Sequence, residues 1–180
     1  YIKWVDIKVT AKAMQEAFRY DVNTCQSSPH LNWVDLLSYL GTRYGGDFSK
    51  YSTKDLDALA EQLLSGKTLE ELTANMKYYT YYRQAYGAVL DGLVGQYDIQ
   101  IAAENAPLFA TPAVNSDGTT DPDRVWVTKY GLKAFSPIAK GFPYQDYDDF
   151  GVSRSYGYKR QHLGHDMMGQ VGTPVIAVES

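Results

Sequence analysis

The hydrophobic pattern of this chain changes from a helical to a strand-like period near Gln100, and this change limits the folds open to it. Before that point, apolar residues recur every three or four positions, which places them on one face of a helix. In the stretch 52–66 that face consists of Leu56, Leu59, Ala60, Leu63 and Leu64. Further helices are expected over residues 10–20, 32–46, 67–76 and 78–94. Residues 1–100 therefore predict a compact all-helical module.

Residues that favour helix ends support these boundaries. Ser52 with Asp55, and Thr68 with Glu71, have the spacing of capping boxes at helix starts. A glycine pair at positions 45–46 stands where the second helix is expected to stop. The helical prediction thus rests on periodicity and on end signals together.

Beyond Gln100 the composition and the period both change. Residues 101–124 are rich in Ala, Pro, Asn, Ser, Asp, Gly and Thr and have no periodic apolar face, which predicts a linker. From Arg124 onward, Gly and Pro punctuate three β-like runs, RVWVTKYGLKAF, SRSYGYKR and GTPVIAVES. The last of these predicts a strand over 175–178 that is buried on at least one face. The remaining length, 125–180, is marginal for an independent β-fold, so we expect a truncated domain. The predicted class is α+β, with an N-terminal helical module followed by the first strands of an antiparallel β-domain.

Composition excludes several classes of protein. The net charge of −4 argues against a nucleic-acid binder, which would carry a basic patch. No apolar run is long enough to cross a bilayer. Because Tyr1 opens directly into folded-looking sequence, we expect that the natural N-terminus, with any export signal or membrane anchor, has been trimmed away. Cys25 is the single cysteine, so a disulfide framework or a cysteine-based zinc site is excluded within the chain.

One pair of side chains suggests metal chemistry. His162 and Asp166 form the pattern H-x-x-x-D ahead of the segment 172–175, G-T-P-V. Imidazole nitrogen and carboxylate oxygen are both zinc donors, and a catalytic zinc usually has about three protein ligands and a water. Such a zinc polarises a carbonyl and lowers the pKa of its water. The pattern alone is equally compatible with a surface loop in which the two side chains only bond to each other.

The surrounding residues narrow the choice. The stretch YGYKRQHLGHDMMGQVGTPVIAVES contains, in order, Arg160, His162, Gly164, Asp166, the methionine pair 167–168 and the segment 172–175. It resembles the first metal motif of the lysostaphin-type zinc metallopeptidases, a family of bacterial peptidoglycan endopeptidases. The resemblance spans about residues 130–180.

This resemblance carries functional expectations. It implies that His162 and Asp166 are the first two ligands of one zinc ion in the full-length protein, which hydrolyses peptide bonds of peptidoglycan in the bacterial cell envelope or outside the cell. The family's further zinc ligand and its catalytic histidine come from a later H-x-H motif, so no catalytic residue is expected within these 180 residues. With two ligands present, the chain is expected to bind zinc weakly and to be inactive by itself.

Two neighbouring residues and one distant histidine complete the candidate list. His165 and Arg160 are expected to lie behind the ligands or along the substrate groove. His30, in the stretch SPHLNW at a helix entrance, is interpreted as a local hydrogen-bonding residue.

Two alternatives stay open. One is a non-catalytic envelope scaffold that keeps the fold without a working metal site. The other is a glycan-binding helical module, because the stretch YYTYYRQAY supplies five tyrosines that cannot all share one helix face, namely Tyr78, Tyr79, Tyr81, Tyr82 and Tyr86. Packing between the helical module and the β-domain would also explain these rings.

Overall fold

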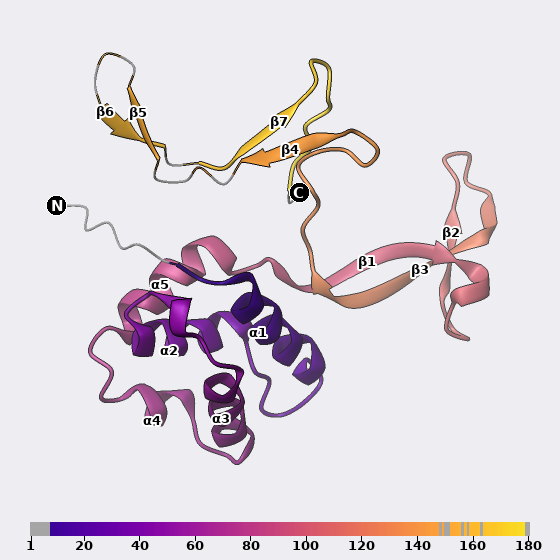
Figure 1. The fold of residues 1–180 in the computed structure, drawn as a ribbon. Coiled ribbons are helices and arrows are strands. Elements are labelled where there is room, and N and C mark those ends of the chain that lie inside the picture. Colours follow the sequence, from indigo (N-terminus) through magenta and orange to yellow (C-terminus); the bar gives the residue numbers. More distant parts are fainter. Residues whose placement is uncertain are drawn as a thin grey trace. The chain divides into compact units, whose positions relative to one another are not determined.

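The computed structural model describes residues 8–147, 149, 152–155, 157, 159–162 and 164–178. The chain divides into two compact units, Tyr1–Lys133 and Ala134–Ser180. Helices come first and antiparallel strands follow (Figure 1), which confirms the predicted α+β class.

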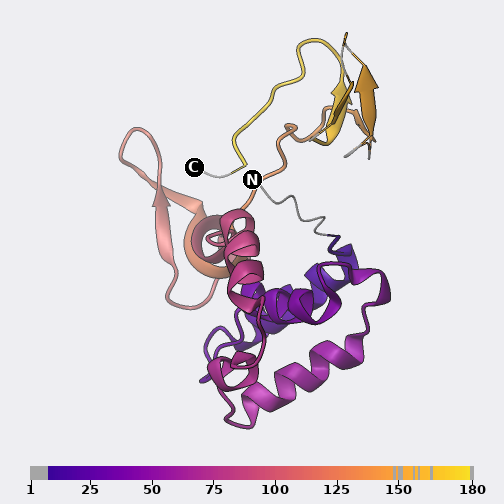
Figure 2. The ribbon, with the colours of Figure 1, turned by 90° about the vertical axis from the view of Figure 1, so that its left-hand side faces the viewer.

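The expected helices are all present in the first unit. They are α1 (Ala11–Thr24), α2 (Trp33–Tyr44), α3 (Thr53–Leu64), α4 (Leu69–Thr73) and α5 (Tyr79–Leu90), with a short 3-10 turn at Phe48–Lys50. Figures 1 and 2 show them gathered in one cluster. No helix within the described ranges is long and apolar enough to cross a membrane.

The two predicted capping boxes have different outcomes. At the start of α4 the box is formed, because the Thr68 hydroxyl accepts from the Glu71 backbone N–H and the Glu71 carboxylate accepts from the Thr68 backbone N–H. At the start of α3, Ser52 caps the helix alone. The prediction for Asp55 is wrong because its carboxylate accepts instead from the Tyr44 hydroxyl at 2.5 Å. A tertiary hydrogen bond has replaced the local one.

The core of the first unit lies around α2, which packs against α1, α3 and α5. Leu36, Leu37 and Leu40 of α2 are fully buried. Gly41 allows α5 to approach, since a Cβ there would lie 2.6 Å from the ring of Tyr86. The predicted apolar face of α3 is buried except for Leu64, which ends the helix and is 49% exposed.

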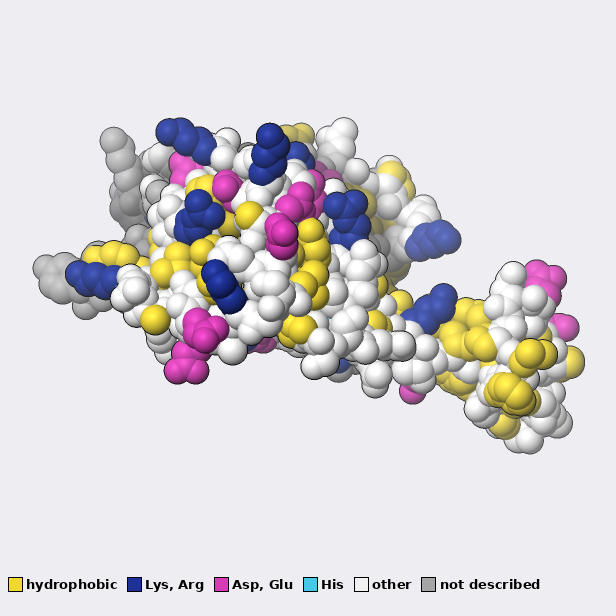
Figure 3. Space-filling model, turned by 90° about the horizontal axis from the view of Figure 1, so that it is seen from below, with side chains coloured by type: hydrophobic (Ala, Val, Ile, Leu, Met, Phe, Trp, Pro, Cys, Tyr) yellow, Lys and Arg dark blue, Asp and Glu magenta, His cyan; other side chains and the backbone are white. Residues whose placement is uncertain are grey.

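A three-stranded antiparallel ribbon extends from the helices (Figures 1 and 2). Its strands are β1 (Val94–Ala102), β2 (Thr111–Val114) and β3 (Thr120–Leu132), in the order β1-β3-β2. The register runs from Val94 opposite Leu132 to Ala102 opposite Arg124. Leu108 and Phe109, in the loop before β2, are almost fully exposed, and Figure 3 shows hydrophobic side chains at the end of the ribbon.

The ribbon includes residues 101–124, which were expected to be a linker. Its strand β1 also takes up residues 94–100, which were expected to belong to the helical module. The β-like run 124–135 does contain a strand, since β3 reaches Leu132. The division into units falls after Lys133 rather than within 101–124.

The turn residues of the stretch 101–124 form a hairpin loop. The Asn115 N–H bonds to the Thr119 carbonyl at 2.8 Å, the Asp117 carboxylate accepts from the Thr119 N–H, and Gly118 takes a positive φ of 82°. Asn, Asp and Gly are typical of tight turns as well as of linkers, so composition did not separate the two.

A buried carboxylate joins the ribbon to the helices. Asp21 of α1 is 0% exposed and accepts from the Trp33 backbone N–H at 2.8 Å and from the Tyr130 hydroxyl of β3 at 2.7 Å. The ring of His30 lies 2.9 Å from the same carboxylate, as expected of a local hydrogen-bonding residue. Burial raises the pKa of the Tyr130 phenol, and its hydrogen bond to Asp21 adds to that rise.

The second unit contains two strand pairs. They are β4 (Tyr144–Tyr147) with β7 (Asp166–Gly169), and β5 (Ser153–Ser155) with β6 (Lys159–Gln161). The run SRSYGYKR, expected to be extended, folds back on itself as the β5–β6 hairpin, with Gly157 at a positive φ of 84°.

The segment 175–178, predicted to be a strand with a buried face, differs from that prediction in the structure. Its backbone pairs with an upstream segment, through hydrogen bonds from Phe135 to Val178 and from Ile176 to Pro137, both 2.9 Å long. Within this segment, the regular β-pairing is limited to one isolated antiparallel bridge, between Ile138 and Val175. The prediction of a buried face is wrong for Val175, Ile176 and Val178, which are 76%, 43% and 42% exposed. The upstream segment forms hydrogen bonds with the backbone of this segment, but it does not cover the side chains.

Candidate metal centre

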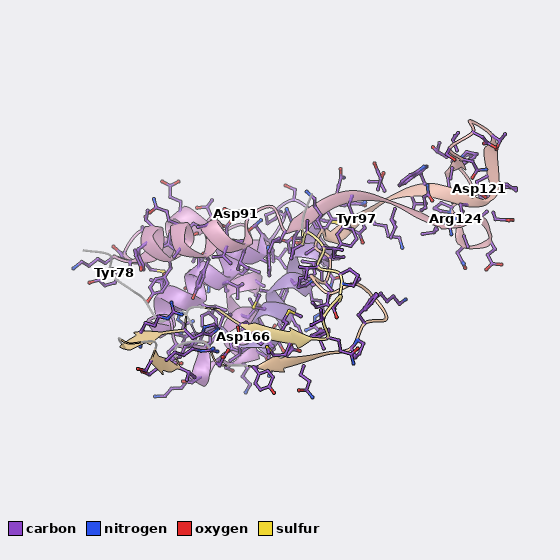
Figure 4. The ribbon with its side chains drawn as sticks, turned by 90° about the horizontal axis from the view of Figure 1, so that it is seen from above. Tyr78, Asp91, Tyr97, Asp121, Arg124 and Asp166 are labelled. Carbon is purple, nitrogen blue, oxygen red and sulfur yellow. The ribbon has the colours of Figure 1, made fainter. Side chains whose placement is uncertain are left out.

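The two strand pairs of the second unit bring the predicted ligands together. The β5–β6 pairing continues by one hydrogen bond, from the His162 backbone N–H to the Val152 carbonyl at 2.9 Å. This bond fixes His162 at the end of the hairpin. Asp166 is the first residue of β7 and pairs with Tyr147 of β4 (Figure 4). From these two anchored positions the imidazole and the carboxylate approach each other.

The imidazole faces two carboxylates. His162 Nε2 lies 3.2 Å from Asp166 Oδ1 and 3.5 Å from Asp149 Oδ1. Ligand atoms of all three residues lie within 4.8 Å of one another. Their side chains are largely shielded, with exposed fractions of 21% for His162, 20% for Asp149 and 35% for Asp166. The structure thus adds a third donor, Asp149, to the predicted pair.

The spacing and the bonding of these atoms fit a zinc ion. Two ligand atoms that each lie about 2.1 Å from a tetrahedral zinc are separated by about 3.4 Å, close to both separations measured from His162 Nε2. His162 Nε2 and Asp149 Oδ1 are buried atoms that have no hydrogen-bond partner among the described residues. Buried polar atoms of this kind normally have a partner. A cation bound between them would satisfy both.

Arg154 of β5 holds the two carboxylates from the other side. Its Nη2 atom donates to Asp166 Oδ2 at 2.6 Å and also to Asp149 Oδ2. The hydrogen bond from Arg154 lowers the pKa of Asp166 below its ordinary value, and the neighbouring His162 acts in the same direction. Asp166 is therefore ionised at neutral pH, the form in which a carboxylate binds metal.

The sequence pattern does not indicate Asp149 or Arg154. Asp149 belongs to the acidic run 146–149, which the sequence does show. The distance of that run from His162 along the chain matches no metal motif considered above. Arg154 is one of two arginines in the hairpin, opposite Arg160 in the register. The sequence does not show which of the two arginines contacts the aspartates, because that contact forms only when the hairpin folds.

His165 and Arg160 are the other two candidates. Nε2 of His165 lies 3.0 Å from Asp146 Oδ1, and the His165 side chain is 47% exposed. Arg160 is exposed on β6. Among the described residues, His165 is not part of the group of His, Cys, Asp and Glu side chains that could hold an ion.

The tyrosines of α5 serve partly as core. Tyr82 and Tyr86 are buried among the helices of the first unit, whereas Tyr78 and Tyr81 are 56% and 40% exposed. The helical unit also has a pocket of about 380 Å³, lined by residues that include Pro29, His30, Leu63 and Lys67. The α5 tyrosines are not among its lining residues. The exposed rings therefore lie outside this pocket.

Comparison with known proteins adds no relative. No protein-family model matches the chain, and neither a curated protein nor a solved structure matches it.

Proposed function

We propose that the second unit is the first part of a zinc-dependent endopeptidase domain that hydrolyses peptide bonds of peptidoglycan. The observation that carries the proposal is the convergence of His162 Nε2 with Oδ1 of Asp166 and of Asp149. Two of these three atoms are buried and have no hydrogen-bond partner in the described part of the chain. The resemblance of the stretch 156–180 to the lysostaphin-type metal motif supports zinc as the ion and peptidoglycan as the substrate.

In this proposal each side chain has a definite task. His162 and Asp166 hold the ion, and Asp149 is a third donor on the same side of the imidazole. Arg154 donates to Oδ2 of both aspartates, and its hydrogen bond lowers the pKa of Asp166. A zinc ion bound there would polarise the scissile carbonyl and lower the pKa of an attached water.

The remaining chemistry needs a second motif. The family resemblance implies that an H-x-H pair supplies a further ligand and the histidine that assists proton transfer. We therefore assign metal binding to residues 149–166 and endopeptidase activity to a protein that carries both motifs. Its substrate places that protein in the bacterial cell envelope or outside the cell.

The proposal predicts the behaviour of an Asp166→Ala variant in a chain that carries both motifs. Hydrolysis should fall below detection, because the substitution removes a charged ligand and leaves Asp149 as the one carboxylate of the group found among the described residues. The measurement is the release of new amino groups from purified peptidoglycan. Addition of a chelator should have the same effect on the unmodified protein, and zinc should restore its activity.

Asp146→Ala is the matched control. Asp146 is a carboxylate of the same unit, and it lies next to His165 instead of the three donors. Its loss should leave hydrolysis near the wild-type rate. Peptidoglycan binding without cleavage by the unmodified protein would contradict the proposal and favour a non-catalytic envelope scaffold.

A further inference from the structure

Arg154 contacts both aspartates of the candidate metal centre through one atom. Its Nη2 donates to Oδ2 of Asp166 and to Oδ2 of Asp149. The other oxygen of each carboxylate, Oδ1, faces Nε2 of His162. The guanidinium thus takes one oxygen of each aspartate and leaves the other directed toward the imidazole.

This division matters because cations use carboxylates differently. Zinc takes about four ligands in a tetrahedral arrangement. Calcium takes about six to eight oxygens and commonly binds a carboxylate through both of its oxygens. With each Oδ2 bonded to Arg154, the centre offers a cation one oxygen from Asp149 and one from Asp166.

We propose that Arg154 determines the metal specificity of the centre, because it restricts Asp149 and Asp166 to binding through a single oxygen and so favours zinc over calcium. The inference rests on the proposed metal centre. It goes beyond that proposal because the sequence motif that indicates the centre begins only at Arg160. Arg154 acts through the two aspartates, as a positioning residue.

The effect of the Arg154 charge on metal affinity has to be separated from the effect of its hydrogen bonds. Loss of a positive charge strengthens the attraction for zinc and for calcium by nearly the same Coulomb energy, since both ions carry two charges. The ratio of the two affinities largely cancels this contribution. The ratio therefore reports how the carboxylate oxygens are used.

The test replaces Arg154 by methionine, which keeps an unbranched side chain and removes every donor. Zinc and calcium affinities of the 180-residue chain are measured by competition with chromophoric chelators. We expect the zinc-to-calcium ratio to fall about tenfold or more, the lower end of the usual effect of losing an outer partner of a metal ligand. Arg160→Met is the control, because it removes the same charge from the opposite position in the hairpin and should leave the ratio near the wild-type value.

The outcomes separate this inference from the metal centre itself. Zinc binding by the wild-type chain together with an unchanged ratio in Arg154→Met would overturn the role of Arg154 alone. A wild-type chain that binds neither ion would overturn both.

A second measurement decides the matter if Arg154→Met does not fold. Four-coordinate cobalt absorbs visible light far more strongly than six-coordinate cobalt, so the cobalt-loaded wild-type chain should show the strong spectrum. A weak spectrum would indicate a six-coordinate ion and would contradict the four-coordinate site that this inference requires.

Discussion

A chain in which His162 is replaced by alanine should bind zinc about a hundredfold more weakly than the wild-type chain, or worse. Loss of an outer partner already costs about 10–100-fold in metal affinity, and His162 supplies the nitrogen that faces both carboxylates. The two aspartates would keep their bonds to Arg154, but the remaining donors would be oxygens, which suit calcium or magnesium better than zinc. Titration against a zinc chelator gives the affinity directly.

His165→Ala is the matched control for this experiment. The same side chain is removed three residues away, from a ring that pairs with Asp146 outside the three donors. Zinc affinity should stay close to the wild-type value. A loss in His165→Ala as large as that in His162→Ala would show that the ligand assignment is wrong.

Replacing Asp21 by alanine should destabilise the helical unit by about 3–5 kcal/mol, the usual cost of removing one partner from a buried charged network. The substitution leaves the Trp33 N–H and the Tyr130 hydroxyl without their acceptor. It also removes the partner of His30. Urea unfolding followed by the helical circular dichroism signal measures the change, because all described helices belong to the first unit.

Asp57→Ala controls for the loss of a carboxylate bonded to a tyrosine. Asp57 accepts from the Tyr20 hydroxyl at 2.8 Å, as Asp21 does from Tyr130, but it is exposed. The expected cost is about 0.5 kcal/mol or less, typical of surface substitutions. If Asp21→Ala were no more costly than Asp57→Ala, the buried network would not hold the ribbon to the helices.

Local signals in the sequence were enough to predict the helices. Contacts that form a helix join residues three or four positions apart, so the periodic leucines of α3 and the Thr68–Glu71 capping box are visible within one turn. The β-like run 124–135 was predicted and contains most of β3, but its pairing with β1 was not, because that pairing joins distant residues such as Ile101 and Val125. The turn residues of the ribbon resemble those of a linker until the pairing is known.

The same limit applies to the candidate site, where local patterns were predictable and contacts between distant residues were not. His162 and Asp166 lie four residues apart and within a recognisable string, so a motif indicates them. Arg154 and Asp149 reach the centre only because the β5–β6 hairpin folds back and places position 152 opposite position 162. No short sequence motif predicts that these two residues meet at the centre.

The central claim is that His162, Asp166 and Asp149 form one metal centre. The most direct measurement is anomalous diffraction at the zinc absorption edge, from crystals of the chain grown with zinc. We predict a zinc peak about 2.0–2.2 Å from His162 Nε2 and from the Oδ1 atom of Asp166. Zinc bound elsewhere on the chain, with no peak among these three side chains, would contradict the claim.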